Sequence, residues 1–200
     1  MGLAVMILGL ALFLGIHLLP ARRDLRGRIV SAMGEGSYKL VYALVSVLGI
    51  VLIAWGFAHY RAAGMVDVWE GAVSPKTLVI LKHITLALML PAAILFVASY
   101  LRGHIYTTLK HPMLVGVKLW AAAHLLSNGD LGSIILFGSF LAWAVFDRIS
   151  LKRRADPGGP PIPVGGWGND AIAVAVGIIV YVALAFAFHP VVIGVSVVGV

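Results

Sequence analysis

The chain has 200 residues, of which 61% are hydrophobic and 12% are charged, with a mean hydropathy of +1.02. These values exclude an ordinary soluble domain and indicate a membrane protein, because one span needs about 20 apolar helical residues. The formal net charge of +7 does not indicate nucleic-acid binding, since the basic residues form short clusters at the ends of apolar runs. Cysteine is absent, which excludes disulfides and Cys-ligated metals.

Six apolar runs predict an all-α membrane protein, a single domain over residues 1–200 folded as a polytopic bundle of about six helices. The expected spans are residues 2–19, 40–58, 77–100, 112–128, 131–146 and 171–188. Asn169 or Asp170 is expected to cap the last of these helices. Residues 157–168 contain four Pro and five Gly, which predicts an extended linker before that helix.

The positions of Lys and Arg predict the orientation, because cytoplasmic loops carry an excess of these residues. The basic residues of the first, third and fifth loops include Arg22, Arg23, Arg26, Arg28, Arg102, Lys110, Arg148, Lys152, Arg153 and Arg154. The second and fourth loops together contain only Arg61 and Lys76. We therefore expect these two loops and both termini to lie on the outer side of the membrane.

Ionisable side chains inside apolar runs are energetically costly, so each is a candidate functional residue. The candidates are His17, Lys82, His83, Lys118 and His124, with His111 at the mouth of the fourth span.

Two pairs of histidines lie at matched membrane depth. His17 and His111 share the expected cytoplasmic side, a geometry that can hold a haem iron. Lys118 follows His111 by two helical turns on the same face, where it would lie near an anionic group such as a haem propionate. His83 and His124 form a competing pair on the opposite side. The alternatives are that His17 and His111 bind backbone groups and that Lys118 snorkels to the interface.

A short motif occurs twice, as HPMLVGV at residues 111–117 and as HPVVIGV at residues 189–195. We interpret the shared His-Pro pair as similar local geometry, in which Pro opens a helical or re-entrant segment and His holds the preceding, non-helical position. Motifs of hydrolases and of phosphate-binding loops are absent from the sequence, and only eight acidic residues occur. Hydrolase and phosphotransfer chemistry is therefore disfavoured.

Three blocks of the sequence resemble the NnrU family of bacterial membrane proteins. They are GIHLLPARRDLR at residues 15–26, LKHPMLVGVKLWAAAHLLSNGDL at 109–131 and WAVFDRISLKRR at 143–154. The family takes its name from a protein associated with nitrite and nitric oxide reductase function in denitrifying bacteria. It is similar to the plant 15-cis-zeta-carotene isomerase, a haem b enzyme with histidine axial ligands. The resemblance matches His17, His111 and His124 to histidines of the shared blocks.

The resemblance implies a protein of the bacterial inner membrane, in which the orientation predicted from the basic loops puts both termini on the periplasmic side. The leading hypothesis is a haem b protein, ligated by His17 and His111, with an isomerase or redox role on an apolar, isoprenoid-type substrate reached from the bilayer. The first alternative is a non-enzymatic factor that supports nitrite and nitric oxide reductase function through contact with a respiratory reductase. The second is an S-adenosylmethionine-dependent methyltransferase, because the His-Pro-x-x-x-Gly stretch resembles membrane methyltransferases.

The chain departs from the isomerase pattern at two places that bear on the substrate. His17 is followed by Leu18 and Leu19, where the isomerase has Ser and Gly, and Lys110 replaces the Arg that usually precedes His-Pro.

Overall fold

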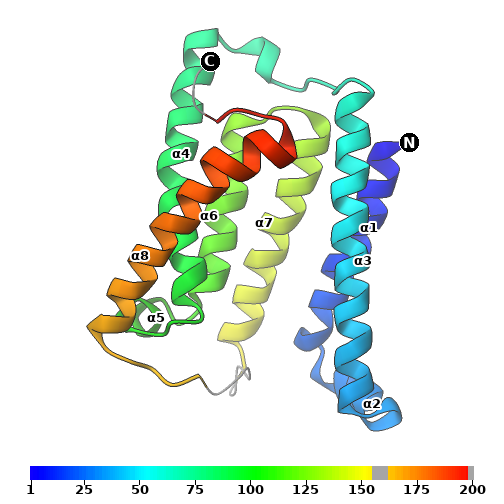
Figure 1. Ribbon diagram of the computed structural model, residues 1–200. Helices are drawn as coiled ribbons and strands as arrows, with labels where there is room; N and C mark the ends of the chain where they lie inside the picture. Colours follow the sequence, from blue (N-terminus) through cyan, green and yellow to red (C-terminus); the bar gives the residue numbers. More distant parts are fainter. Residues whose placement is uncertain (155–161, 198–200) are drawn as a thin grey trace. The chain divides into compact units, whose positions relative to one another are not determined.

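The computed structural model describes residues 1–154 and 162–197, and these residues form helices joined by short loops (Figure 1). Five of the described helices are long and apolar enough to span a membrane, and a sixth apolar helix, Pro112–Ser127, is shorter. The predicted all-α, multi-pass membrane fold is confirmed. The chain divides into two compact units, Met1–Val68 with Asp130–Arg153 (unit 1) and Trp69–Gly129 with Arg154–Val200 (unit 2).

Unit 1 is built from α1 (Gly2–Leu18), α2 (Arg23–Met33), α3 (Glu35–Ala62) and α7 (Leu131–Lys152), with a 3-10 turn at Leu19–Ala21. The helix α3 begins at Glu35, before the predicted span at residue 40, because polar residues complete its first turns. An ion pair of 2.9 Å joins Glu35 to Lys39 there. Likewise, α7 continues beyond the predicted residue 146 through a polar end, so both helices extend past their apolar stretches.

Glycines allow α1 and α3 to pack backbone to backbone (Figure 1). Gly2 and Gly9 lie seven residues apart on α1, and Gly49 and Gly56 lie seven apart on α3. A Cβ atom built on Gly9 would lie 2.6 Å from the backbone nitrogen of Ile53. The helices therefore approach closer than any residue with a side chain would permit, which is a common means of association between membrane helices.

Tyr60 connects the end of α3 to the start of α7 within unit 1. Its ring lies against Gly132, and its hydroxyl accepts a hydrogen bond of 2.9 Å from the Val66 N–H. The Val66 carbonyl accepts a second bond of 2.9 Å from the Leu131 N–H. Asp130 caps α7 by accepting a 2.9 Å bond from the backbone of the first turn. These bonds fix the entry of α7 onto the α1–α3 pair.

Unit 2 is built from α4 (Pro75–Ala98), α5 (His104–Leu109), α6 (Pro112–Ser127), α8 (Trp167–Ala183) and a π-helical segment, η3 (Leu184–Ile193), with a 3-10 turn at Glu70–Ala72. The helix α4 packs against both α6 and α8 (Figure 1). Thr85 of α4 donates a buried hydrogen bond of 2.7 Å to the Ala123 carbonyl of α6. On α8, Gly177 packs against Ile94 of α4, so small residues again allow close contact.

Asp170 has a different role from the one predicted. We expected Asn169 or Asp170 at the N-cap of the last span, and this is wrong, because α8 begins directly after Gly166. The Asp170 carboxylate instead accepts bonds from the backbone N–H groups of His104, at 2.8 Å, and Ile105, at 3.1 Å. It therefore caps α5, a helix more than sixty residues away in the sequence.

The linker predicted over residues 157–168 is described only in part. Residues 157–161 lie outside the described residues, and residues 162–166 have no regular secondary structure, as expected. Residues 167 and 168 already belong to α8.

Candidate functional site

His17 lies in the last turn of α1 within an aromatic cluster of unit 1. Its ring centroid is 4.1 Å from that of Phe13, 5.2 Å from that of Tyr42 and 5.9 Å from that of Trp143. Its Nδ1–H donates a bond of 2.7 Å to the Phe13 carbonyl. Because a carbonyl can only accept, the proton is on Nδ1 and Nε2 is the basic nitrogen. A backbone carbonyl on the other ring nitrogen is also how proteins orient a ligating histidine.

The indole of Trp143 presents an unsatisfied donor beside this histidine. Its Nε1 atom is buried and has no hydrogen-bond partner among the described residues. Such groups are rare in folded proteins, and each needs an explanation. A bound group with an acceptor atom next to His17 would satisfy it. A basic histidine nitrogen and an orphaned donor in aromatic surroundings together fit the edge of a haem.

His111 has the local geometry expected from its sequence. It is the N-cap of α6, with φ −139° and ψ 65°, and Pro112 is the first helical residue. The preceding Lys110 has φ 62°, in the left-handed region that a side chain disfavours. Lys118 is partly buried on α6 and has no hydrogen-bond or ion-pair partner in the described part of the chain. The contact expected between Lys118 and an anionic group stays a prediction.

The five predicted site residues are divided between the two units. His17 belongs to unit 1, and the other four, His83, His111, Lys118 and His124, belong to unit 2. Joint ligation of one iron by His17 and His111 therefore also stays a prediction.

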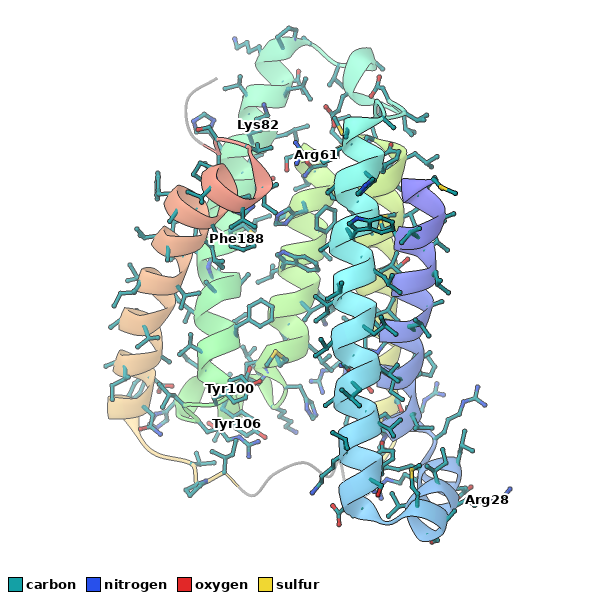
Figure 2. The ribbon with its side chains drawn as sticks, turned by 45° about the vertical axis from the view of Figure 1, so that its right-hand side comes forward. Arg28, Arg61, Lys82, Tyr100, Tyr106 and Phe188 are labelled. Atoms are coloured by element: carbon teal, nitrogen blue, oxygen red, sulfur yellow. The ribbon has the colours of Figure 1, made fainter. Side chains whose placement is uncertain are left out.

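Unit 2 contains a cavity of about 150 Å³ between α4, the end of α6, and the end of α8 with the segment that follows it. Its lining residues are Lys82, Thr85, Leu86, Met89, Ala93, His124, Ser127, Asn128, Tyr181, Leu184, Ala185, His189, Val195, Ser196 and Val197. Lys82 and Phe188 mark this end of unit 2 in Figure 2, and Tyr100 and Tyr106 mark the other end. The lining combines an apolar floor with several polar groups, as small-molecule sites do.

Two histidines lie side by side in the cavity wall, His124 from α6 and His189 from η3. Their ring centroids are 6.3 Å apart. The Nδ1–H of His124 donates to the Trp120 carbonyl at 2.8 Å, and that of His189 donates to the Leu184 carbonyl at 2.7 Å. The backbone therefore fixes the tautomer and the orientation of both rings.

The π-helical turn places His189 in the cavity wall. We expected His189 at a non-helical position before a helix that Pro190 opens, and this is wrong, because both residues lie inside η3. Proline removes a backbone donor and clashes with the preceding turn of an α-helix, which favours a local π-bulge. Gly194, in the left-handed conformation at φ 74°, then ends the helix and turns the chain back, so that Val195 lines the cavity.

The competing pair predicted from the sequence is not brought together at this cavity. His124 lines it, whereas His83 is exposed and donates its Nδ1–H to the Val79 carbonyl at 2.7 Å. Sequence reasoning did not assign His189 or Tyr181 to a site. The signal that was available for His189 was the repeated His-Pro motif, which we interpreted as backbone geometry alone.

The size of the cavity decides what it can hold. At about 150 Å³ it is smaller than the 300–1,000 Å³ of sites for drug-sized ligands. It is comparable to an engineered cavity that holds one benzene molecule. A small molecule therefore matches the volume of this cavity.

Of three comparisons with known proteins, the one with family models gives a match. Comparison with curated proteins and with solved structures gives no match. The family model described as NnrU protein matches residues 5–197, nearly the whole chain. This membrane protein therefore belongs to the NnrU family.

Proposed function

We propose that the protein binds haem b in the membrane, that His17 would ligate the iron, and that the protein acts in an isomerase or redox reaction on an apolar substrate. The observation that supports the proposal is the pairing of a backbone-oriented His17 with the orphaned Trp143 N–H, 5.9 Å away between ring centroids. His59, His83 and His124 donate the same bond to the carbonyl four residues earlier, so the orphaned Trp143 donor is what distinguishes the surroundings of His17.

Residues of the aromatic cluster would hold the group in defined ways. His17 would supply the ligating nitrogen, the Phe13 carbonyl holds the orientation of its ring, and the Trp143 N–H would be available to donate to an acceptor atom of the bound group. Phe140 adds an apolar wall, with its ring centroid 5.6 Å from that of Phe13. Haem would supply a redox-active iron and a Lewis acid in a site that excludes water.

The proposal is tested by the absorption spectrum of detergent-purified protein, oxidised and dithionite-reduced, after expression with sufficient haem. We expect a Soret band that shifts on reduction in the wild type and is largely lost in His17→Ala. His59→Ala is the matched control, because His59 also donates Nδ1–H to the carbonyl four residues before it but is exposed. A wild-type spectrum without a Soret band, or a His17→Ala spectrum equal to wild type, contradicts the proposal.

The second ligand is assigned by the same measurement on further variants. The sequence predicts that His111→Ala also weakens the band, whereas loss of the band in His83→Ala or His124→Ala would favour the competing pair. A wild-type spectrum without a Soret band would favour the hypothesis of a non-enzymatic factor. That hypothesis is tested by co-purification of the protein with a reductase subunit. Saturable S-adenosylmethionine binding would instead indicate the methyltransferase.

We further propose that the protein lies in the bacterial inner membrane with both termini on the periplasmic side, on the basis of the basic loops. Because the chain has no cysteine, single introduced cysteines report orientation without background. We expect exposed Ala72→Cys to react with an impermeant maleimide in spheroplasts, and exposed Ser31→Cys to react only after the membrane is permeabilised. The reverse labelling pattern would invert the proposed topology.

A further inference from the structure

The described lining of the unit 2 cavity includes one lysine, Lys82. This lysine lies in the second turn of α4, inside a candidate span, and is partly buried. It has no hydrogen-bond or ion-pair partner among the described residues. A charge at such a place is costly and is normally paired, so an unpaired lysine that lines a cavity indicates that the cavity receives its partner.

The other lining residues provide no counter-charge. Neither Asp nor Glu is among the lining residues of the described chain. Tyr181 also lines the cavity, and its hydroxyl has no partner in the described part of the structure. An ammonium group and a free hydroxyl are both donors, which suits a ligand with an anionic oxygen.

The apolar residues of the cavity determine which ligand can bind beyond its anionic oxygen. Leu86, Met89 and Ala93 of α4 and Ala185 of η3 form an apolar surface below the polar groups. At about 150 Å³, the space accepts one aromatic ring or a short alkyl chain. A bare inorganic anion would leave this apolar surface without a contact.

We propose that this cavity binds a small amphipathic carboxylate, with the carboxylate on Lys82 and Tyr181 and the apolar body on the α4 floor. The site lies wholly within unit 2 and does not rest on haem binding by His17. Such a ligand has two sources, an aromatic acid from the aqueous phase or a medium-chain fatty acid from the bilayer. Both acids have the same carboxylate group. They differ in the apolar part that would contact α4.

The test is a titration of the purified full chain in lipid nanodiscs with benzoate and with octanoate, followed by isothermal calorimetry. We expect saturable binding of at least one acid, and a loss of affinity of at least about tenfold in Lys82→Met. Lys82→Arg should retain most of the affinity because it keeps the charge. The matched control is Lys76→Met, an exposed lysine on the same helix, which should bind as the wild type does.

Two more measurements separate a specific site from partition into lipid. Benzyl alcohol, which has the ring but no charge, should bind equally to wild type and Lys82→Met. Ala185→Leu should abolish binding of both acids by filling the floor. Absence of saturable binding of either acid, or equal affinity in wild type and Lys82→Met, overturns the proposal. The Soret band is read in the same samples, so failure of this site and failure of the haem site are distinguished.

Discussion

Replacement of Gly56 by leucine is expected to separate α1 from α3 and to prevent unit 1 from folding. A Cβ atom at this position would lie 2.8 Å from the Gly2 carbonyl oxygen and 2.8 Å from the Met6 Cα atom, and it would also meet the Met6 nitrogen. All three atoms belong to the backbone of α1, so no change of side-chain rotamer relieves the clash. The two helices must move apart, which removes their contact along several turns.

A graded pair of variants measures the effect. Gly56→Ala should lower the free energy of unfolding by about 1–3 kcal/mol, the usual cost of overpacking, and Gly56→Leu should leave no folded protein in mild detergent. The matched control is Gly36→Ala on the same helix, where an added Cβ meets nothing within 4 Å. Alanine is the better helix former, so this control should unfold at the wild-type temperature or above it. Equal unfolding temperatures for Gly56→Ala and Gly36→Ala would show that the helices do not approach so closely.

Apolar length was sufficient to locate the apolar helices, five of which are long and apolar enough to span a membrane and a sixth of which is shorter, because the bilayer sets the length of a spanning helix. It was not sufficient for their ends. The polar first turns of α3 are stabilised by local pairs such as Glu35–Lys39, which a search for apolar runs does not register. The helix α2 was missed for the same reason, since arginines dominate its sequence and hide the apolar positions Leu25, Ile29 and Met33, which recur every four residues.

The candidate sites were predictable only where local chemistry determined them. His111 and Pro112 form a helix N-cap as expected, because the geometry of that dipeptide is fixed by its own sterics. The same dipeptide at His189 lies inside a π-helix, because the chain before it is already helical and the turn at Gly194 folds the following residues onto the cavity. The same dipeptide therefore adopts two structures, and the difference comes from the chain around it.

Replacement of Asp170 by alanine is the second change for which we expect a large effect. Three donors converge on this carboxylate, namely the N–H groups of His104 and Ile105 and the Nδ1–H of His104, at 3.1 Å. The alanine variant leaves the start of α5 without its cap and releases the contact between α5 and α8. The ring of Trp167, stacked on His104 with 4.2 Å between centroids, then loses the partner that the carboxylate orients.

Trypsin reports this loosening directly, since Arg102 and Lys110 flank α5. We expect Asp170→Ala to be cleaved faster at both sites and to melt about 5 °C below wild type. Asp170→Asn should lie between the two, because its side-chain oxygen can still accept a bond from one N–H group. Asp24→Ala removes an exposed carboxylate from α2 of unit 1 and should leave both cleavage rates unchanged. Wild-type cleavage rates in Asp170→Ala would mean that α5 is held by its apolar contacts, with the carboxylate dispensable.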